Sequence, residues 1–156
     1  MKSLENILKP KTENEILKNL SKLSQHELND KLMHYSITGG RNDISELLIK
    51  AGANVNIKYK SGYSILMYTS MFGNKDLAQI LINNGADVNQ KDASGWTALM
   101  IAVNKSYIDI VKILINNGAD VNAKIKAVNC YYTVLDMAKE RRSIDILKIL
   151  QNKITN

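Results

Sequence analysis

The chain has 156 residues, 45% of them hydrophobic, and a formal charge of +6, which is the composition of one soluble domain. No apolar run reaches the roughly 18 residues that a transmembrane helix needs, and charges interrupt residues 1–10, unlike a secretory signal. The single cysteine excludes an internal disulfide and is typical of a reducing compartment, so we expect a cytoplasmic protein.

Residues 1–25 are predicted to contain one amphipathic helix that belongs to no repeat. Thr12 and Glu15 have the spacing of a capping box, and Ser24 and Glu27 form a second one that starts the next helix. Between them, four apolar side chains fall on one helix face: Ile16, Leu17, Leu20 and Leu23. We expect this helix to cover the apolar end of the domain that follows. A partner-binding helix is the alternative.

From residue 26 onward the sequence repeats with a period of 33. Segments 52–56, 85–89 and 118–122 each read Gly-Ala-Asx-Val-Asn, and segment 61–67 is answered by segment 94–100. A fixed period in this range marks an array in which each unit buries its apolar face only against its neighbours. The period predicts four units, at residues 26–58, 59–91, 92–124 and 125–153, of which the first and last are degenerate.

Each unit is predicted to form two short helices and a turn. Ser64, Thr97 and Thr133 are the N-caps of the first helices in the last three units. The second helices of the middle units end at Gly85 and Gly118, where glycine can adopt the left-handed conformation. The turn at residues 125–132 holds three extra residues and lacks the glycine of the two preceding turns, so its hairpin must differ.

The repeated segments resemble ankyrin repeats, whose 33-residue unit carries T-P-L-H-x-A and G-A-D-V-N. The resemblance covers about residues 26–153 and implies an all-α, L-shaped solenoid of helix-turn-helix units with hairpin turns along one edge. Ankyrin domains act overwhelmingly as protein-binding modules, usually through the concave face formed by the turns and first helices. The resemblance therefore implies a non-enzymatic adaptor that binds another protein, without a metal, a cofactor or a small-molecule substrate. We expect it to be a monomer.

The chain departs from the ankyrin pattern at several positions. The proline of the family is absent, and its histidine survives only as His34, whose ring is expected to bond the neighbouring backbone. The glycine that follows the first helix is present as Gly40 and Gly73 but becomes Ser106 and Arg142. Each replacement is expected to cost about 1 kcal/mol in a left-handed conformation and to change the bend of the last two units.

The residue inventory offers little chemistry for catalysis. The chain has two histidines, one cysteine and no glycine-rich phosphate loop; His26 is expected to be solvated, and Cys130 to be buried or incidental. A separate pattern involves Asn56, Asn89 and Asn122, which resemble sites of an asparaginyl hydroxylase in animals. The simpler interpretation, which we favour, is that these asparagines bond the hairpin backbone.

Candidate partner-binding residues follow from the positions that the stack leaves exposed. The residue after the turn glycine is Tyr63 in the second unit and Trp96 in the third, with Tyr132 equivalent in the fourth and Asp30 in the first. Successive units would place the aromatic side chains side by side as a ladder on the concave edge, where such residues dominate binding. The alternative is that each ring packs over its own hairpin.

The ends of the first helices add a second set of candidates. Met71 and Phe72 are apolar where the neighbouring units are polar. Lys105 and Arg141 are cations that would favour a partner with acidic residues. The set comprises Met71, Phe72, Asn104, Lys105 and Arg141.

The sequence also allows functions other than protein binding by an adaptor. Residues 125–156 carry +3 of the net charge, which allows weak nucleic-acid or anionic-lipid binding, although interspersed acids favour a solvated helix surface. A composition rich in Asn, Ile and Lys is typical of A+T-rich genomes and allows an effector of an intracellular microbe, acting in host cytoplasm by the same binding mode. The chain could also be a fragment of a larger regulatory protein.

Overall fold

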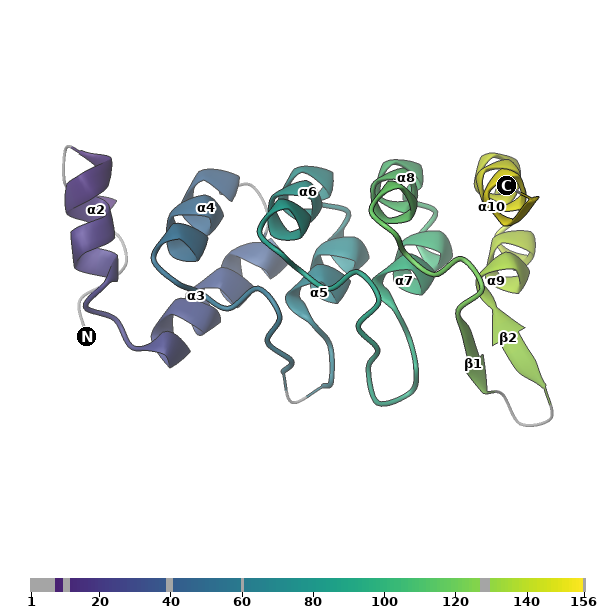
Figure 1. The fold of residues 1–156 in the computed structure, drawn as a ribbon, viewed down its shortest axis with the longest axis horizontal. Helices are drawn as coiled ribbons and strands as arrows, with labels where there is room; N and C mark the ends of the chain where they lie inside the picture. The colour runs from purple at the N-terminus through teal and green to yellow at the C-terminus, as the bar shows by residue number, and fades with distance from the viewer. Residues whose placement is uncertain (1–7, 10–11, 39–40, 60, 127–129, 156) are drawn as a thin grey trace.

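The computed structural model describes residues 8–9, 12–38, 41–59, 61–126 and 130–155. Its helices lie in two layers (Figure 1). One layer holds the first helix of each unit: α3 (Gln25–Thr38), α5 (Ile65–Phe72), α7 (Ala98–Asn104) and α9 (Val134–Glu140). The other holds the second helices: α4 (Asn42–Lys50), α6 (Lys75–Asn83), α8 (Ile108–Asn116) and α10 (Ile144–Thr155). We call these the inner and outer helices. The hairpins extend from the inner helices along one edge, which confirms the predicted all-α solenoid.

The core is a continuous apolar strip between the two layers. Inner helices pack on inner helices of neighbouring units, and outer helices on outer ones, so each unit is buried by the next. One leucine at the same place in every outer helix has no exposed surface: Leu48, Leu81, Leu114 and Leu150. This repetition explains the 33-residue period, because each unit must offer the same apolar residues to its neighbours.

The N-caps of the inner helices lie where the sequence predicts them. The side-chain oxygens of Ser64, Thr97 and Thr133 accept the backbone N–H groups three residues later. Ser24 and Glu27 form the expected capping box, since each side chain accepts the other residue's backbone N–H, at 2.9 and 3.3 Å. The hydrogen bonds from Ser24 lower the pKa of Glu27.

The turns between inner and outer helices use the left-handed conformation, as predicted. Gly73 has a φ of 78° at the end of α5. Ser106 and Arg142, which replace glycine in the next two units, have φ values of 59° and 53°. Both pay the steric penalty of a side chain in this region. Gly40 lies outside the described residues.

The first unit departs from the predicted alignment. The buried residues of α3, Leu32, Met33 and Ser36, lie 34 residues before their buried counterparts in α5, whereas the period predicts a spacing of 33. The counterparts are Leu66, Met67 and Ser70. Met33 therefore takes the buried place expected for His34. The His34 side chain is exposed, and its ring meets the edge of Tyr35 at 5.3 Å between centroids. The prediction of a structural histidine is wrong, because α3 and the turn after it are one residue longer than the period allows.

The helix α3 also replaces a hairpin. It has 14 residues, against 8 in α5, and begins at Gln25. Asp30, which the 33-residue alignment placed on a hairpin turn, is therefore a helical residue in α3. In the fourth unit the lengthened hairpin forms two antiparallel strands, β1 (Lys124–Lys126) and β2 (Tyr131–Thr133), with Ile125 opposite Tyr132. Residues 127–129 between them lie outside the described ranges.

The two ends of the array differ in how they are covered. At the N-terminal end, α2 (Glu13–Leu20) packs against α4, with Leu20 fully buried and Glu13 2.6 Å from the Lys50 ammonium. At the C-terminal end, the positions that bury Met100, Val103 and Ile115 in the third unit carry polar side chains instead. The replacements, 36 residues later, are Asp136, Lys139 and Gln151.

Candidate protein-binding surface

In the predicted aromatic ladder, the Tyr63 and Tyr132 side chains contact residues of their own units. Tyr63 precedes the N-cap of α5, and its ring meets Tyr68 of the same unit at 5.4 Å between centroids and an angle of 64°. The Tyr68 hydroxyl lies 2.9 Å from the Ser61 hydroxyl. Among the described residues, no ring pair joins Tyr63 to Trp96, or Trp96 to Tyr132. The sequence analysis did not include Tyr68 among the candidate surface residues. It could have been noticed as an aromatic residue at the position where the third unit has Ile101.

The other two rings are held by their hairpin and helix. Trp96 is half-buried against the core, and its backbone N–H donates to the Asp92 carboxylate at 2.7 Å. The Tyr132 hydroxyl donates to Glu140, the last residue of α9, so this side chain runs along the inner helix. Burial and the Glu140 carboxylate raise the pKa of Tyr132 to about 12.

The second candidate set lies at the far ends of the inner helices. Phe72 ends α5 and is 48% exposed, whereas Met71 beside it is half-buried. Lys105 is exposed. The structure brings Asn104 and Arg141 together across two units: the guanidinium donates to the amide oxygen from Nε at 3.0 Å and from Nη2 at 2.5 Å.

The eight candidates therefore form two rows and not one patch. We call Tyr63, Trp96 and Tyr132 the hairpin row, and Met71, Phe72, Asn104, Lys105 and Arg141 the turn row. An inner helix lies between the rows in each unit. The helix α5 has 8 residues, and at 1.5 Å per residue it separates the rows by about 12 Å.

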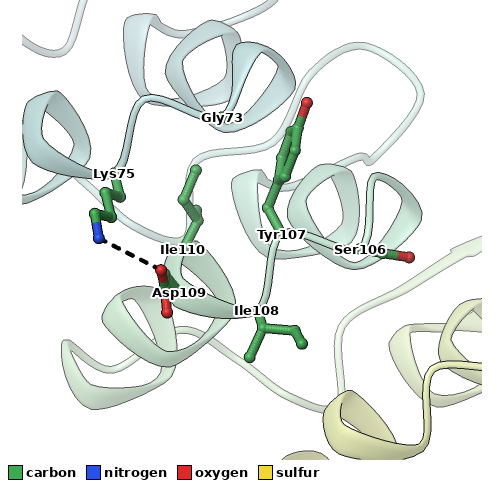
Figure 2. Close-up of a pocket in the computed structure, with 7 residues that line it drawn as sticks. All are labelled: Gly73, Lys75, Ser106, Tyr107, Ile108, Asp109 and Ile110. Carbon is green, nitrogen blue, oxygen red and sulfur yellow. Dashed lines mark ion pairs between the residues drawn. The ribbon is translucent and has the colours of Figure 1, made fainter.

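A shallow cavity of about 350 Å³ opens between the turns of the second and third units (Figure 2). Its wall includes Tyr107, which is 38% exposed and lies over Gly73; a Cβ added to Gly73 would be 3.0 Å from the ring. Lys75 and Asp109 form an ion pair of 3.5 Å at its side. The sequence pattern did not single out Tyr107, which occupies the place of Asn74 in the preceding unit.

Comparison with known families agrees with this architecture. The family model described as ankyrin repeats (3 copies) matches residues 10–92, 32–125 and 91–156. The chain belongs to the ankyrin-repeat family. Ankyrin repeats generally mediate protein–protein interaction and are typically non-enzymatic. No curated protein matches the sequence at a significant level.

The asparagines of the ankyrin repeats bond the backbone of the next repeat. Asn56 donates from Nδ2 to the Gly85 carbonyl and accepts the Asp87 N–H at its Oδ1, both at 2.8 Å. Asn89 makes the same two bonds to Gly118 and Asp120, at 2.9 and 2.8 Å. Both asparagines therefore have the expected structural role, but they bond the Gly-Ala-Asp segment of the next repeat and not their own hairpin. Asn122 forms no such pair among the described residues, because the fourth repeat ends without the Gly-Ala-Asx segment.

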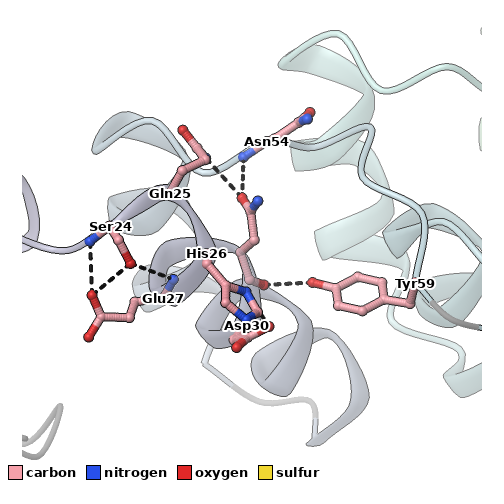
Figure 3. A network of polar contacts seen from close by, with 8 residues as sticks. Ser24, Gln25, His26, Glu27, Asp30, Asn54 and Tyr59 are labelled. Carbon is pink, nitrogen blue, oxygen red and sulfur yellow. Dashed lines mark hydrogen bonds and ion pairs between the residues drawn. The ribbon is translucent and has the colours of Figure 1, made fainter.

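Two residues of α3 perform the same task for the first repeat (Figure 3). Gln25 donates from Nε2 to the Gly52 carbonyl, and the Asn29 amide oxygen accepts the Asn54 N–H, both at 2.8 Å. The buried Asn29 also accepts the Tyr59 hydroxyl at its carbonyl, 2.8 Å away. Burial raises the pKa of Tyr59 to about 12. This network joins the helix that replaces a hairpin to the end of its own repeat, through Gly52 and Asn54, and to the start of the second repeat, through Tyr59.

The remaining reactive side chains lie apart from one another. His26 is exposed, as predicted, and faces Asp30 at 3.4 Å. Cys130 is exposed just before β2, so of the two expected alternatives, a buried or an incidental thiol, the structure contradicts the buried one. Within the described ranges, no group of three or more His, Cys, Asp or Glu side chains is placed to hold a metal ion. The same ranges contain no helix that is both long and apolar enough to span a bilayer.

Proposed function

We propose that this ankyrin-repeat chain is a non-enzymatic adaptor that binds a partner protein across the inner helices, between the hairpin row and the turn row. The observation that carries the proposal is Phe72. It is a large apolar side chain, 48% exposed at the end of α5, where the next two repeats have Lys105 and Arg141. Core packing does not account for it, and exposed aromatic residues of this kind are typical binding anchors.

The mechanism is recognition by a rigid surface. The side chains of both rows are held in place before binding: Tyr63 by Tyr68, Tyr132 by Glu140, and Arg141 by Asn104. Little conformational entropy is then lost when the partner docks, which favours affinity. The proposal includes a monomeric protein, since the apolar helix faces are buried between repeats and the last repeat has a polar outer face. It also includes a cytoplasmic location, because a single free cysteine is typical of a reducing compartment.

The test uses Phe72→Ala with Ile144→Ala as its matched control. Ile144 is also an exposed apolar residue, at 66%, but it starts an outer helix of the fourth repeat. Proteins captured from the native cell by the wild-type chain are identified, purified and titrated by calorimetry. Phe72→Ala should weaken binding by about 2 kcal/mol, or roughly thirtyfold, and Ile144→Ala by less than about twofold. Equal affinity of the wild type and Phe72→Ala would refute the proposed site.

A further inference from the structure

The charge of the molecule is divided unevenly between its two layers. The outer helices together carry no net charge: α6 and α8 each hold as many acids as bases, α4 holds one more acid, and α10 holds one more base. By contrast, the hairpins at residues 58–64, 91–97 and 124–133, with the inner helices and turns that follow them, hold eight cations and three acids among the described residues, a net charge of +5. The basic character of the chain therefore belongs to the binding face.

The three acids of this face are already engaged within the protein. Asp92 accepts the N–H groups of Ser94 and Trp96, at 2.9 and 2.7 Å. Asp136 accepts the backbone N–H and the hydroxyl of Thr133. Glu140 accepts the Tyr132 hydroxyl. Their lone pairs are directed into caps and turns, so the excess cations are the groups left to face a partner.

Three of the cations form a row at the same place in successive hairpins. Lys58, Lys91 and Lys124 are 33 residues apart and exposed, and their hairpins stand side by side along one edge (Figure 1). The Lys58 ammonium donates to the Lys91 carbonyl at 2.7 Å, and the Lys124 ammonium lies 4.4 Å from the centroid of the Tyr131 ring. We call these residues the lysine row. The contacts at Lys58 and Lys124 fix positive charge at the hairpins.

We infer that the lysine row binds an acidic segment of the partner protein, which crosses the hairpins from the second to the fourth repeat. The inference rests on the proposed function and names the chemistry of the partner. Packed helices lie about 8–10 Å apart, so Lys58 and Lys124, which are two repeats apart at the ends of the row, are separated by roughly 20 Å. An extended chain at about 3.3 Å per residue covers that span in six or seven residues, with a carboxylate at every third position meeting one lysine.

A protein segment fits this face better than a nucleic acid. Single-stranded nucleic acids bind by stacking bases on open aromatic rings beside a basic groove. Here the Tyr63 ring is packed against Tyr68, and the Tyr132 side chain is tied to Glu140. The exposed Tyr131 ring already has the Lys124 ammonium over it. Asp92 and Glu140 lie on the same face and would repel phosphates. An acidic peptide can place its carboxylates at the lysines and its uncharged residues at these positions.

The experiment compares two triple variants that change the charge equally on different layers. The first is Lys58→Glu, Lys91→Glu and Lys124→Glu. Its matched control is Lys112→Glu, Lys148→Glu and Lys153→Glu, three exposed lysines of the outer helices α8 and α10. Circular dichroism melts check that both fold. The triple Lys→Gln variant of the lysine row serves as a milder change, because it removes the charges without introducing repulsion.

The probes are peptides selected from a random 16-residue library on the wild-type protein, titrated by fluorescence anisotropy. We expect the selected peptides to be enriched in Asp and Glu, and to bind more weakly as salt rises from 50 to 200 mM. The lysine-row variant should raise the Kd at least tenfold, the glutamine variant at least threefold, and the outer-layer control less than twofold.

Three results would overturn the inference, each in a different way. Selected peptides without acidic enrichment, bound equally by both triple variants but more weakly by Phe72→Ala, would refute the lysine row and support the proposed function. Binding of a 24-nucleotide oligothymidylate that is tighter than that of any peptide, and is lost in the lysine-row variant, would make the row a nucleic-acid site. Selected peptides insensitive to both the lysine row and Phe72 would refute both proposals.

Discussion

The hydrogen-bonded asparagines make a prediction that contains its own control. Asn89 and Asn122 occupy the same place in successive Gly-Ala-Asp-Val-Asn segments, but only Asn89 has a following repeat segment to bond. Asn89→Ala removes two hydrogen bonds of 2.9 and 2.8 Å to Gly118 and Asp120. Intramolecular hydrogen bonds contribute about 0.5–1.5 kcal/mol each, so we expect a loss of about 1–3 kcal/mol in the free energy of unfolding.

Urea denaturation followed by circular dichroism measures the effect. Asn122→Ala should change the free energy of unfolding by less than about 0.5 kcal/mol, as a surface substitution without a lost contact. Asn56→Ala should resemble Asn89→Ala, because Asn56 makes the equivalent bonds to Gly85 and Asp87. If Asn122→Ala destabilises the protein as much as Asn89→Ala, the effect comes from the local hairpin conformation, and the bonds between repeats are not what these residues contribute.

Further substitutions test the packing, the N-terminal helix and the turns. Trp96→Ala removes a half-buried side chain, so it should lower the free energy of unfolding by about 2 kcal/mol and weaken partner binding roughly thirtyfold. Leu99 is 1% exposed, so Leu99→Ala should lower the free energy of unfolding by about 2–5 kcal/mol and leave binding unchanged. Thermal melts and binding titrations of both variants measure these effects. Deleting residues 1–24 should lower stability by about 2–4 kcal/mol through loss of the buried Leu20, and an unchanged melting temperature would contradict a capping role. Ser106→Gly should raise stability by about 0.5–1 kcal/mol, and Gly73→Ala should lower it by more than about 1 kcal/mol, since the first relieves and the second creates strain at positive φ.

Local sequence signals were sufficient for most of the fold. The N-caps at Ser64, Thr97 and Thr133 and the left-handed turns depend on residues within one helical turn of each other, and the 33-residue period then repeats these local signals along the chain. The register of the first repeat was not predictable in this way. The helix α3 is held by Gln25 and Asn29, whose partners Gly52 and Asn54 lie 25 to 27 residues away in the sequence.

The candidate surface was less predictable than the fold, because side-chain direction depends on contacts between repeats. The sequence placed Asn104 and Arg141 at exposed helix ends, and the structure adds that they bond each other. It also placed Tyr63 on the concave edge without indicating that Tyr68 of the following helix, α5, would meet its ring.

The polar C-terminal end of the array also limits how copies of the protein can associate. A solenoid is an open structure, and an apolar end that matched the apolar start of another copy would add molecules head to tail without closure, giving fibres. Asp136, Lys139 and Gln151 stand where a following repeat would need Met100, Val103 and Ile115. Replacing Asp136, Lys139 and Gln151 by Met, Val and Ile, and removing α2, would create two complementary apolar ends. The few polar substitutions that end the stack thus also protect a small solenoid from polymerisation.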